Sequence, residues 1–330
     1  MTLISIVVPF NKGMEDLKPL IDSIMANIDI CNDILKKVDN NALEVILVSE
    51  RKLPLPTDVP LKINFFLLTC GKISVGAARN IGVRKAKGSF IYFVDSDCII
   101  PNNTFKTMIS HIVSIKDDPT IAGVGGPVIG ITTNSTFEKY YNCGLFSPFP
   151  TMMKRVELNY LKLTLCHHPV TANLLLKKEI FNNYEFIDGV GEDLDLVLRV
   201  LRDGKKIIYS PNLVVYHRHR KTLKDFLKHF SRLATYYPEF VKKHKLNPVM
   251  IRRLIVVAPY IIFMYFLILN TPLFLIPLIG ILIHYYYKTK SIKYSISFFL
   301  LDLLIQFAVV PCAVTKEVIR SLWRKMTKRH

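Results

Sequence analysis

The sequence predicts an α/β domain with a mostly parallel central sheet and helices on both faces, followed by C-terminal transmembrane helices. Strand and helix patterns alternate along the first part of the 330-residue chain. The strands are apolar throughout, which is typical of a parallel sheet that is buried on both faces. Residues 254–314 carry almost no acidic groups and are mainly apolar. These patterns predict a globular domain with a membrane anchor.

Four short runs rich in Ile, Val, Phe and Leu are expected to form buried strands. They lie at 3–9, 43–48, 62–68 and 89–94. Apolar residues at helical spacing predict helices at 17–28 and 75–87. Ligands of such sheets bind beyond the carboxyl ends of the strands, where Asn11, Glu50 and Asp95 lie.

The second half of this domain is less regular. Its Gly-rich run at 121–128 is expected to pass close to a ligand or to another backbone. A helix that ends at Gly204 and a basic amphipathic helix suited to a membrane surface are also predicted. The two helices are predicted at 194–203 and 223–237. Strands or extended stretches are predicted at 172–176, 207–209 and 213–216.

The apolar C-terminal part divides into two membrane segments. A single helix over 254–287 would be about 50 Å long, too long for a hydrocarbon core of roughly 30 Å. An Asn-Thr-Pro sequence at 270–272 interrupts it, so a hairpin of two short spanning helices is predicted. The second segment, 294–314, contains Asp302 and Gln306, which are costly in lipid unless they face protein or water.

The formal net charge of +18 follows these membrane segments. Lysine and arginine gather before the hairpin, after it and near the C-terminus, at 252–253, 288–293 and 316–329. The positive-inside rule places all three groups in the cytoplasm, so the segment 294–314 is expected to be re-entrant or interfacial. A third full span is the alternative. Because the membrane accounts for the charge, no nucleic-acid partner is expected.

The acids of Asp95-Ser96-Asp97 follow the strand at 89–94 directly. Two carboxylates at a strand end can converge on Mg²⁺ or Mn²⁺, which takes oxygen ligands and keeps substrate phosphate in its shell. A surface turn with two solvated acids is the alternative.

Two further motifs flank helix starts. Small residues followed by Arg79 and Asn80 suit contact with phosphate or ribose, or else tight helix packing with an exposed arginine. In Gly191-Glu192-Asp193-Leu194-Asp195, a carboxylate at the mouth of a helix can act as a general base. The alternative is that these acids only stabilise the first helical turn.

Histidines supply two more candidate metal ligands. His217 could complete a metal site and Arg218 could hold phosphate, or the stretch 216–220 could be a basic interfacial loop. The run Cys-His-His at 166–168 is a weaker zinc candidate. The six cysteines form no C-x-x-C pair, which argues against a zinc ribbon or a redox motif.

Taken in order, I-V-V-P-F-N, a strand that ends in an acid, G-A-A-R-N-x-G, D-S-D and G-E-D-x-D-L resemble the family 2 glycosyltransferases over residues 3 to 235. The resemblance implies a GT-A fold, a nucleotide-diphosphate sugar donor, a divalent cation (Mn²⁺ or Mg²⁺) and inversion at the anomeric carbon. It also implies roles for eight residues: Pro9, Asn11 and Glu50 around the nucleoside, Arg79 near ribose or phosphate, Asp95 and Asp97 on donor and metal, Asp193 as the base, and His217 as a further metal ligand.

The sequence departs from the family pattern in two places. Ser49-Glu50 stands where two aspartates often follow the second strand, so the contacts to the nucleotide base there differ from the family pattern. The sequence His-Phe-Ser-Arg-Leu at 229–233 replaces the Q-x-x-R-W of processive synthases and argues against chain elongation. Glu192, Arg218 and Arg232 are assigned to the acceptor or phosphate region.

The predicted function is metal-dependent, inverting transfer of a sugar to a lipid-linked acceptor at the cytoplasmic face of the membrane by a multi-pass protein. The predicted parts are a catalytic domain, a basic juxtamembrane linker, a hairpin, a third apolar segment and a basic tail, at 1–235, 236–253, 254–287, 294–314 and 315–330. A nucleotidyltransferase, which would release pyrophosphate, and a non-catalytic membrane scaffold are the alternatives. A Rossmann oxidoreductase is disfavoured because no G-x-G-x-x-G follows the first strand.

Overall fold

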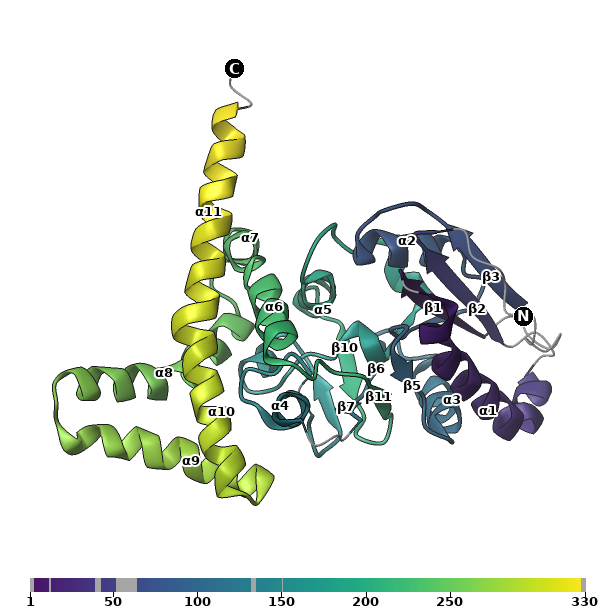
Figure 1. Cartoon of the computed structure of the whole chain (residues 1–330). Coiled ribbons are helices and arrows are strands. Elements are labelled where there is room, and N and C mark those ends of the chain that lie inside the picture. The colour runs from purple at the N-terminus through teal and green to yellow at the C-terminus, as the bar shows by residue number, and fades with distance from the viewer. Residues whose placement is uncertain are drawn as a thin grey trace. The chain divides into compact units, whose positions relative to one another are not determined.

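The computed structural model describes residues 3–11, 13–38, 43–51, 64–131, 135–149 and 151–327 (Figure 1). The chain forms two compact units. The first consists of Met1–Ile129, Thr151–Lys162 and Cys166–Arg218, and the second of Gly130–Pro150, Leu163–Leu165 and His219–His330. Lys62, at the start of a predicted strand, and the tail residues 328–330 lie outside the described ranges.

The first unit is built on an eight-stranded sheet in the order β3-β2-β1-β4-β9-β6-β10-β8. Its strands are β1 (Ile4–Phe10), β2 (Leu43–Ser49), β3 (Asn64–Thr69), β4 (Phe90–Phe93), β6 (Ile121–Gly125), β8 (Val156–Leu158), β9 (Leu174–Lys177) and β10 (Lys206–Tyr209). The first four strands are parallel, as predicted. Strand β9 runs antiparallel to both β4 and β6, and β8 antiparallel to β10, so the far half of the sheet is mixed.

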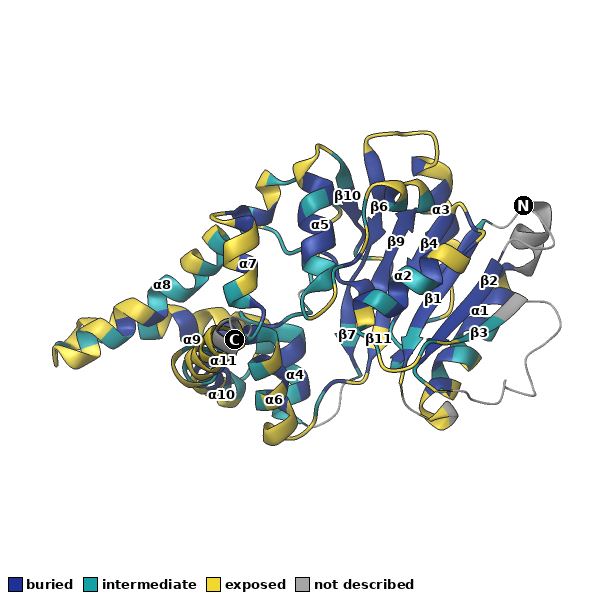
Figure 2. Cartoon of the chain, turned by 90° about the horizontal axis from the view of Figure 1, so that it is seen from above, coloured by how far each residue is buried: buried dark blue, intermediate teal, exposed yellow. Residues whose placement is uncertain are grey.

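Helices cover both faces of this sheet, which explains why its strands are apolar on both sides. Helices α2 (Val75–Lys85) and α5 (Glu192–Arg202) lie on one face, and α1 (Met14–Val38) and α3 (Thr104–Ile115) on the other (Figure 1). The inner strands β2, β1, β4, β9 and β6 are buried (Figure 2), whereas the edge strands β3 and β8 are partly exposed.

A second, three-stranded sheet has the order β5-β11-β7, from β5 (Cys98–Ile99), β11 (Val215–His217) and β7 (Val128–Gly130). The Gly-rich run before β7 passes another backbone. A Cβ atom on Gly123 would lie 2.0 Å from the carbonyl oxygen of Leu175, and one on Gly126 would lie 1.8 Å from that of Leu213. Glycine is therefore required at both positions, because the backbone of Leu175 packs closely on Gly123 and that of Leu213 on Gly126.

The second unit is helical. Its helices are α4 (Thr136–Cys143), α6 (Leu223–Ala234), α7 (Tyr237–His244), α8 (Pro248–Ile268), α9 (Leu275–Thr289), α10 (Ile292–Leu304) and α11 (Val310–Thr327). Their shared core is aromatic and includes Tyr140, Phe226, Phe230, Tyr260 and Phe298. The helix predicted at 223–237 ends at Ala234, and a second helix, α7, begins at Tyr237.

Two prolines affect helix boundaries in this unit in different ways. Pro238 lies in the first turn of α7, where its missing N–H costs nothing, so the chain restarts a helix there. The predicted break at 270–272 is confirmed, with Asn270 at φ 53° between α8 and α9. No break occurs at Pro311, because a π-helical turn at Ile305–Val309 joins α10 to α11 and widens the helix just before the proline ring.

Two helices of the described chain are long and apolar enough to cross a membrane, Pro248–Ile268 and Ile292–Arg324.

Candidate active site

Polar residues follow the carboxyl ends of three adjacent parallel strands of the first unit. Phe10 of β1 pairs with Ser49 of β2, and the amide of Glu50 donates to the carbonyl of Phe10 at 3.4 Å. Strand β4 lies on the other side of β1 and leads into Asp95. Asn11, Glu50 and Asp95 therefore lie along one edge of the sheet, as predicted, while Pro9 lies inside β1.

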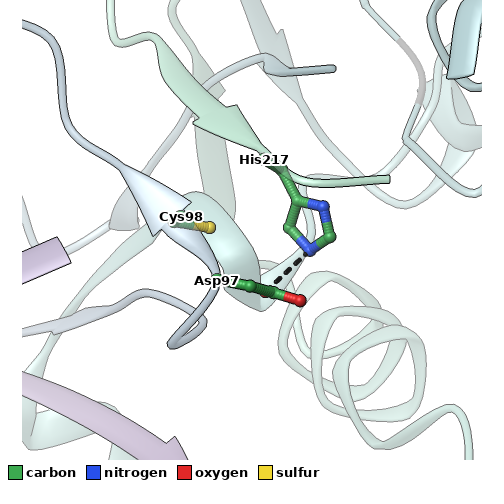
Figure 3. Close-up of side chains that lie close together, drawn as sticks. All are labelled: Asp97, Cys98 and His217. Atoms are coloured by element: carbon green, nitrogen blue, oxygen red, sulfur yellow. Dashed lines mark ion pairs between the residues drawn. The ribbon is translucent and has the colours of Figure 1, made fainter. Parts of the chain in front are cut away.

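Asp97 and His217 lie together beside this edge. Strand β11 runs antiparallel to β5, which brings His217 opposite Cys98 and next to Asp97 (Figure 3). Nε2 of His217 is 3.1 Å from Oδ1 of Asp97, and the amide of Arg218 donates to the carbonyl of Asp97 at 3.2 Å. His217 is almost fully buried, with 3% of its side chain exposed, whereas Asp97 keeps 23%.

Within the described part of the chain, one group of potential metal ligands was found: Asp97, Cys98 and His217, with ligand atoms within 4.8 Å of one another. Cys98 was not singled out in the sequence, although it follows D-S-D directly. Burial raises the pKa of its thiol well above its usual value, and Asp95 and Asp97 raise it further. Sulfur is also a softer ligand than Mg²⁺ or Mn²⁺ selects. The carboxylate and the imidazole fit a divalent cation that takes its other ligands from water and phosphate.

Asp95 faces a different partner from Asp97. Its Oδ1 lies 2.9 Å from Nη2 of Arg79, and Nη1 of Arg79 lies 2.5 Å from Oε1 of Glu192. Only 3% of the Arg79 side chain is exposed, against 31% of Asp95 and 14% of Glu192. The guanidinium therefore bridges the D-S-D loop and the start of α5.

The position of α2 explains this bridge. Ser74 caps the helix by accepting from the amide of Ala77, and a Cβ atom on Gly76 would lie 2.2 Å from the carbonyl oxygen of Ile187. The side chain of Asn80 donates to the carbonyl of Phe186 and accepts from its amide, at 2.8 and 2.9 Å. The motif thus packs α2 tightly against the segment before α5, with Arg79 buried rather than exposed.

Asp193 occupies the first turn of α5 and keeps part of its surface exposed. Its Oδ1 accepts a hydrogen bond from the amide of Leu194 at 2.8 Å. Burial raises the pKa of Asp193, and the positive charge of Arg79 opposes that shift. Burial, and then the charge of Asp193, likewise raise the pKa of Glu192.

The remaining charged candidates have other surroundings. Asp195 is fully buried and pairs with Arg199 one turn later at 2.8 Å, which is a structural role. Burial lowers the pKa of Arg79, but Asp95, Glu192 and Asp193 together raise it by more, so the guanidinium stays charged. Arg232 belongs to the second unit, where it is exposed on α6.

Comparison with known proteins adds a family to this geometry. The profile of the family described as "Glycosyltransferase like family 2" matches residues 69–248. The pre-mycofactocin glycosyltransferase of Mycobacterium tuberculosis is 25% identical over 154 residues, which are 46% of this chain and 31% of that protein.

A second relative comes from Methanococcus voltae: dolichyl N-acetyl-alpha-D-glucosaminyl phosphate 3-beta-D-2,3-diacetamido-2,3-dideoxy-beta-D-glucuronosyltransferase. It is 25% identical over 154 residues, which are 46% of this chain and 47% of that protein. The chain thus spans less than half the length of either relative. A solved mannosyltransferase from Pyrobaculum calidifontis, in complex with GDP-Man and Mn²⁺, aligns with 98% of this chain and 87% of its own at 13% identity and a TM-score of 0.57. The likeness to this structure is one of fold.

Proposed function

This chain belongs to the glycosyltransferase-like family 2 and has the GT-A-like fold that the sequence predicts, and we propose that it transfers a sugar from a nucleotide-diphosphate sugar with inversion at the anomeric carbon. The observation that carries the proposal is the meeting of Asp97, His217, Asp95, Arg79 and the start of α5 at one edge of the sheet. Such a transfer uses a donor site, a base and positive charge for the leaving group, and the residues at this edge are of the types suited to those roles.

Asp193 is the proposed base. It removes the proton of an acceptor hydroxyl, or orients an acceptor phosphate that is already ionised. Its raised pKa suits this role, because a base works best when its pKa lies nearer the working pH.

Asp97 and His217 are the proposed protein ligands of a divalent cation, Mn²⁺ or Mg²⁺. When bound, the cation would supply positive charge for the diphosphate leaving group. The likeness of fold to a mannosyltransferase that binds GDP-Man and Mn²⁺ supports this choice. Asp95, also expected at the metal, is held towards Arg79, and we assign it to the donor.

Around the donor, Pro9, Asn11 and Glu50 are proposed to surround the nucleoside, because they end β1 and follow it and β2. Arg79 acts through its two partners. It fixes the Asp95 carboxylate on the donor side and the Glu192 carboxylate beside the base. The donor-binding residues and the base are thereby held at a constant distance from each other.

The proposed acceptor is lipid-linked, and the catalytic unit faces the cytoplasm. The archaeal relative, whose name gives a dolichyl-linked sugar phosphate as its substrate, supports the first part. The two apolar helices and the basic residues that flank them support membrane attachment and a cytoplasmic face. Arg218 is the proposed contact of the acceptor phosphate, and the role of Arg232, in the second unit, stays a prediction. The sequence predicts a multi-pass protein.

A release assay tests the proposal. Purified protein in detergent is given Mn²⁺, a panel of nucleotide-sugars and a membrane lipid extract, and free nucleoside diphosphate is measured. We expect release with one donor, dependent on lipid extract, and a loss of at least a hundredfold in Asp193→Asn. Pyrophosphate release from a nucleoside triphosphate and a sugar phosphate would instead identify a nucleotidyltransferase. No release from any donor would favour the scaffold.

A further inference from the structure

The polar groups of the third apolar segment face protein. The carboxylate of Asp302, on α10, accepts hydrogen bonds from the hydroxyls of Tyr140, Tyr260 and Tyr285, which come from α4, α8 and α9. Nearby, Arg253 donates to the side-chain oxygen of Gln306 at 2.9 Å. The expectation that Asp302 and Gln306 face protein or water is confirmed, and one side of this segment is therefore covered.

The cover is not suited to lipid. Helix α4 packs on α10, and α6 packs on the π-helical turn and on α11. Phe226 and Phe230 fill the space between them, and the outer side of α6 carries exposed charged residues. These are Lys224, Asp225, Lys228 and Arg232, and the exposed Lys221 lies just before the helix. If the segment 294–314 crossed the bilayer, these charges would be drawn into hydrocarbon, where charged side chains are costly.

The uncovered side of α10 and α11 has the composition of a helix that lies in a membrane surface. It carries large apolar side chains along its length and basic ones beside them. The exposed apolar residues are Ile292, Ile296, Leu300, Phe307, Ile319 and Trp323. The exposed basic residues are Lys293, Lys316, Arg320 and Arg324. Apolar area with flanking lysine and arginine matches the boundary between acyl chains and anionic headgroups.

The hairpin of α8 and α9 differs from this long helix in direction and in exposure. Its base packs on α10 through Tyr260 and Tyr285, and its tip projects away from α10 and α11 (Figure 1). Many of its apolar residues are exposed (Figure 2). From Leu254 to Leu269 the rise is about 22 Å, and the 15 residues of α9 span a similar length. The whole of α8, with 21 residues, is long enough to cross, but its uncharged part after Arg253 and the whole of α9 are each shorter than a hydrocarbon core of roughly 30 Å.

We propose that the chain is monotopic: the α8–α9 hairpin enters one leaflet of an anionic bilayer and returns, while α10 and α11 lie flat in the same membrane surface. Both ends of the hairpin are basic, with Arg252 and Arg253 before it and Lys288 and Lys290 after it, which fits a return to the same headgroup layer. This inference concerns attachment and does not depend on the proposed reaction.

Trp323 allows a direct test, because it is the one tryptophan of the chain and 64% of it is exposed on α11. The full chain is reconstituted into phosphatidylcholine–phosphatidylglycerol vesicles that contain lipids brominated at shallow or at deep acyl positions. We expect blue-shifted emission and at least twofold stronger quenching by shallow than by deep bromines. If the segment 294–314 crosses the bilayer, Trp323 lies nine residues beyond it, in water, where iodide but not bromolipid would quench it; that result would overturn the proposal.

A second pair of probes measures the depth of the hairpin in a Trp323→Phe background. Leu269→Trp, at the tip, should be quenched more by deep bromines, whereas the matched control Leu254→Trp, at the base of α8, should be quenched more by shallow ones. Quenching of the Leu269→Trp probe by iodide trapped inside the vesicles would mean that the hairpin crosses. Blue-shifted Trp323 emission that no bromolipid quenches would mean that a second copy of the chain covers this face, and would also refute the proposal. Nucleoside diphosphate release by Trp323→Phe should equal that of the wild type.

Discussion

Replacing Arg79 tests whether the donor side and the base side of the site are held by one side chain. Its guanidinium makes two charge-assisted hydrogen bonds, to Asp95 and to Glu192, and is 3% exposed. Arg79→Lys keeps the charge, but an ammonium on this helix can reach only one of the two carboxylates. The loss of one hydrogen bond to a charged group costs about 1.5–3 kcal/mol. We expect the lower end of that range, because water reaches Asp95, which is 31% exposed.

The expected effect on transfer follows from this free energy. If the lost bond aligns the donor and the base in the transition state, about 1.4 kcal/mol corresponds to a tenfold decrease in kcat/KM. Arg79→Met should lose more, because two partly buried carboxylates would then lack a cation; breaking a buried pair costs about 3–5 kcal/mol, reduced here by their exposure. Kinetics of nucleoside diphosphate release and the melting temperature in detergent are measured together.

The matched control is Arg84, on the same helix. Its side chain is 62% exposed and lies 3.6 Å from Glu185, which is 70% exposed, so Arg84→Lys and Arg84→Met should change neither activity nor melting temperature. Wild-type kcat/KM in Arg79→Lys would refute the positioning role. A lower melting temperature with unchanged kinetics would show that Arg79 serves folding alone.

The remaining predictions concern the base, the metal and α2. Transfer should fall as pH decreases through the pKa of Asp193, because only the carboxylate accepts a proton. Since burial raises this pKa, the loss of activity should begin at a higher pH than for an ordinary aspartate. A rate that stays constant down to about pH 4 would contradict the assignment. His217→Ala should raise the Mn²⁺ concentration for half-maximal release by about tenfold or more, at an unchanged melting temperature, whereas full turnover in excess chelator would exclude a metal role altogether. Gly76→Ala should destabilise the protein by about 1–3 kcal/mol, because the new Cβ would lie 2.2 Å from the carbonyl oxygen of Ile187. Gly13→Ala should have little effect, because nothing lies within 4 Å of the new Cβ there. Equal melting temperatures for the two variants would refute the packing argument.

The parallel half of the first unit could be predicted because its strands and helices alternate with clear periods. The direction of β9 could not, since a short run of three leucines that is buried on both faces looks the same in either orientation. The end of the helix predicted at 223–237 was placed three residues too late and α7 was missed, because apolar spacing continues across Thr235 and Tyr236 and the restart at Pro238 is a weak local signal.

The candidate site could be located from sequence, but its internal pairing could not. Asn11, Glu50 and Asp95 were identifiable because strand ends carry ligands. Nothing near Arg79 indicates that its partner Glu192 lies 113 positions later, or that Asp95 and Asp97 face different partners. These contacts depend on how α2, α5 and β11 pack, and a local pattern cannot encode the packing of distant elements.

The hydrogen bonds of Asp302 to three tyrosines also determine when the second unit can fold during synthesis. Tyr140 is made 162 residues before Asp302, so at about 5–20 residues per second the ribosome adds its partner roughly 10–30 s later. Until then the aromatic side of α4 has no complete core to pack against, since Phe298 and Ile305 are also still missing. A nascent chain therefore exposes this surface for many seconds, long enough for chaperones to bind it. A premature stop codon shortly before Asp302 should yield a product that is degraded rather than one that merely lacks a tail, because it would leave a hydrophobic surface in the interior of the sequence permanently uncovered.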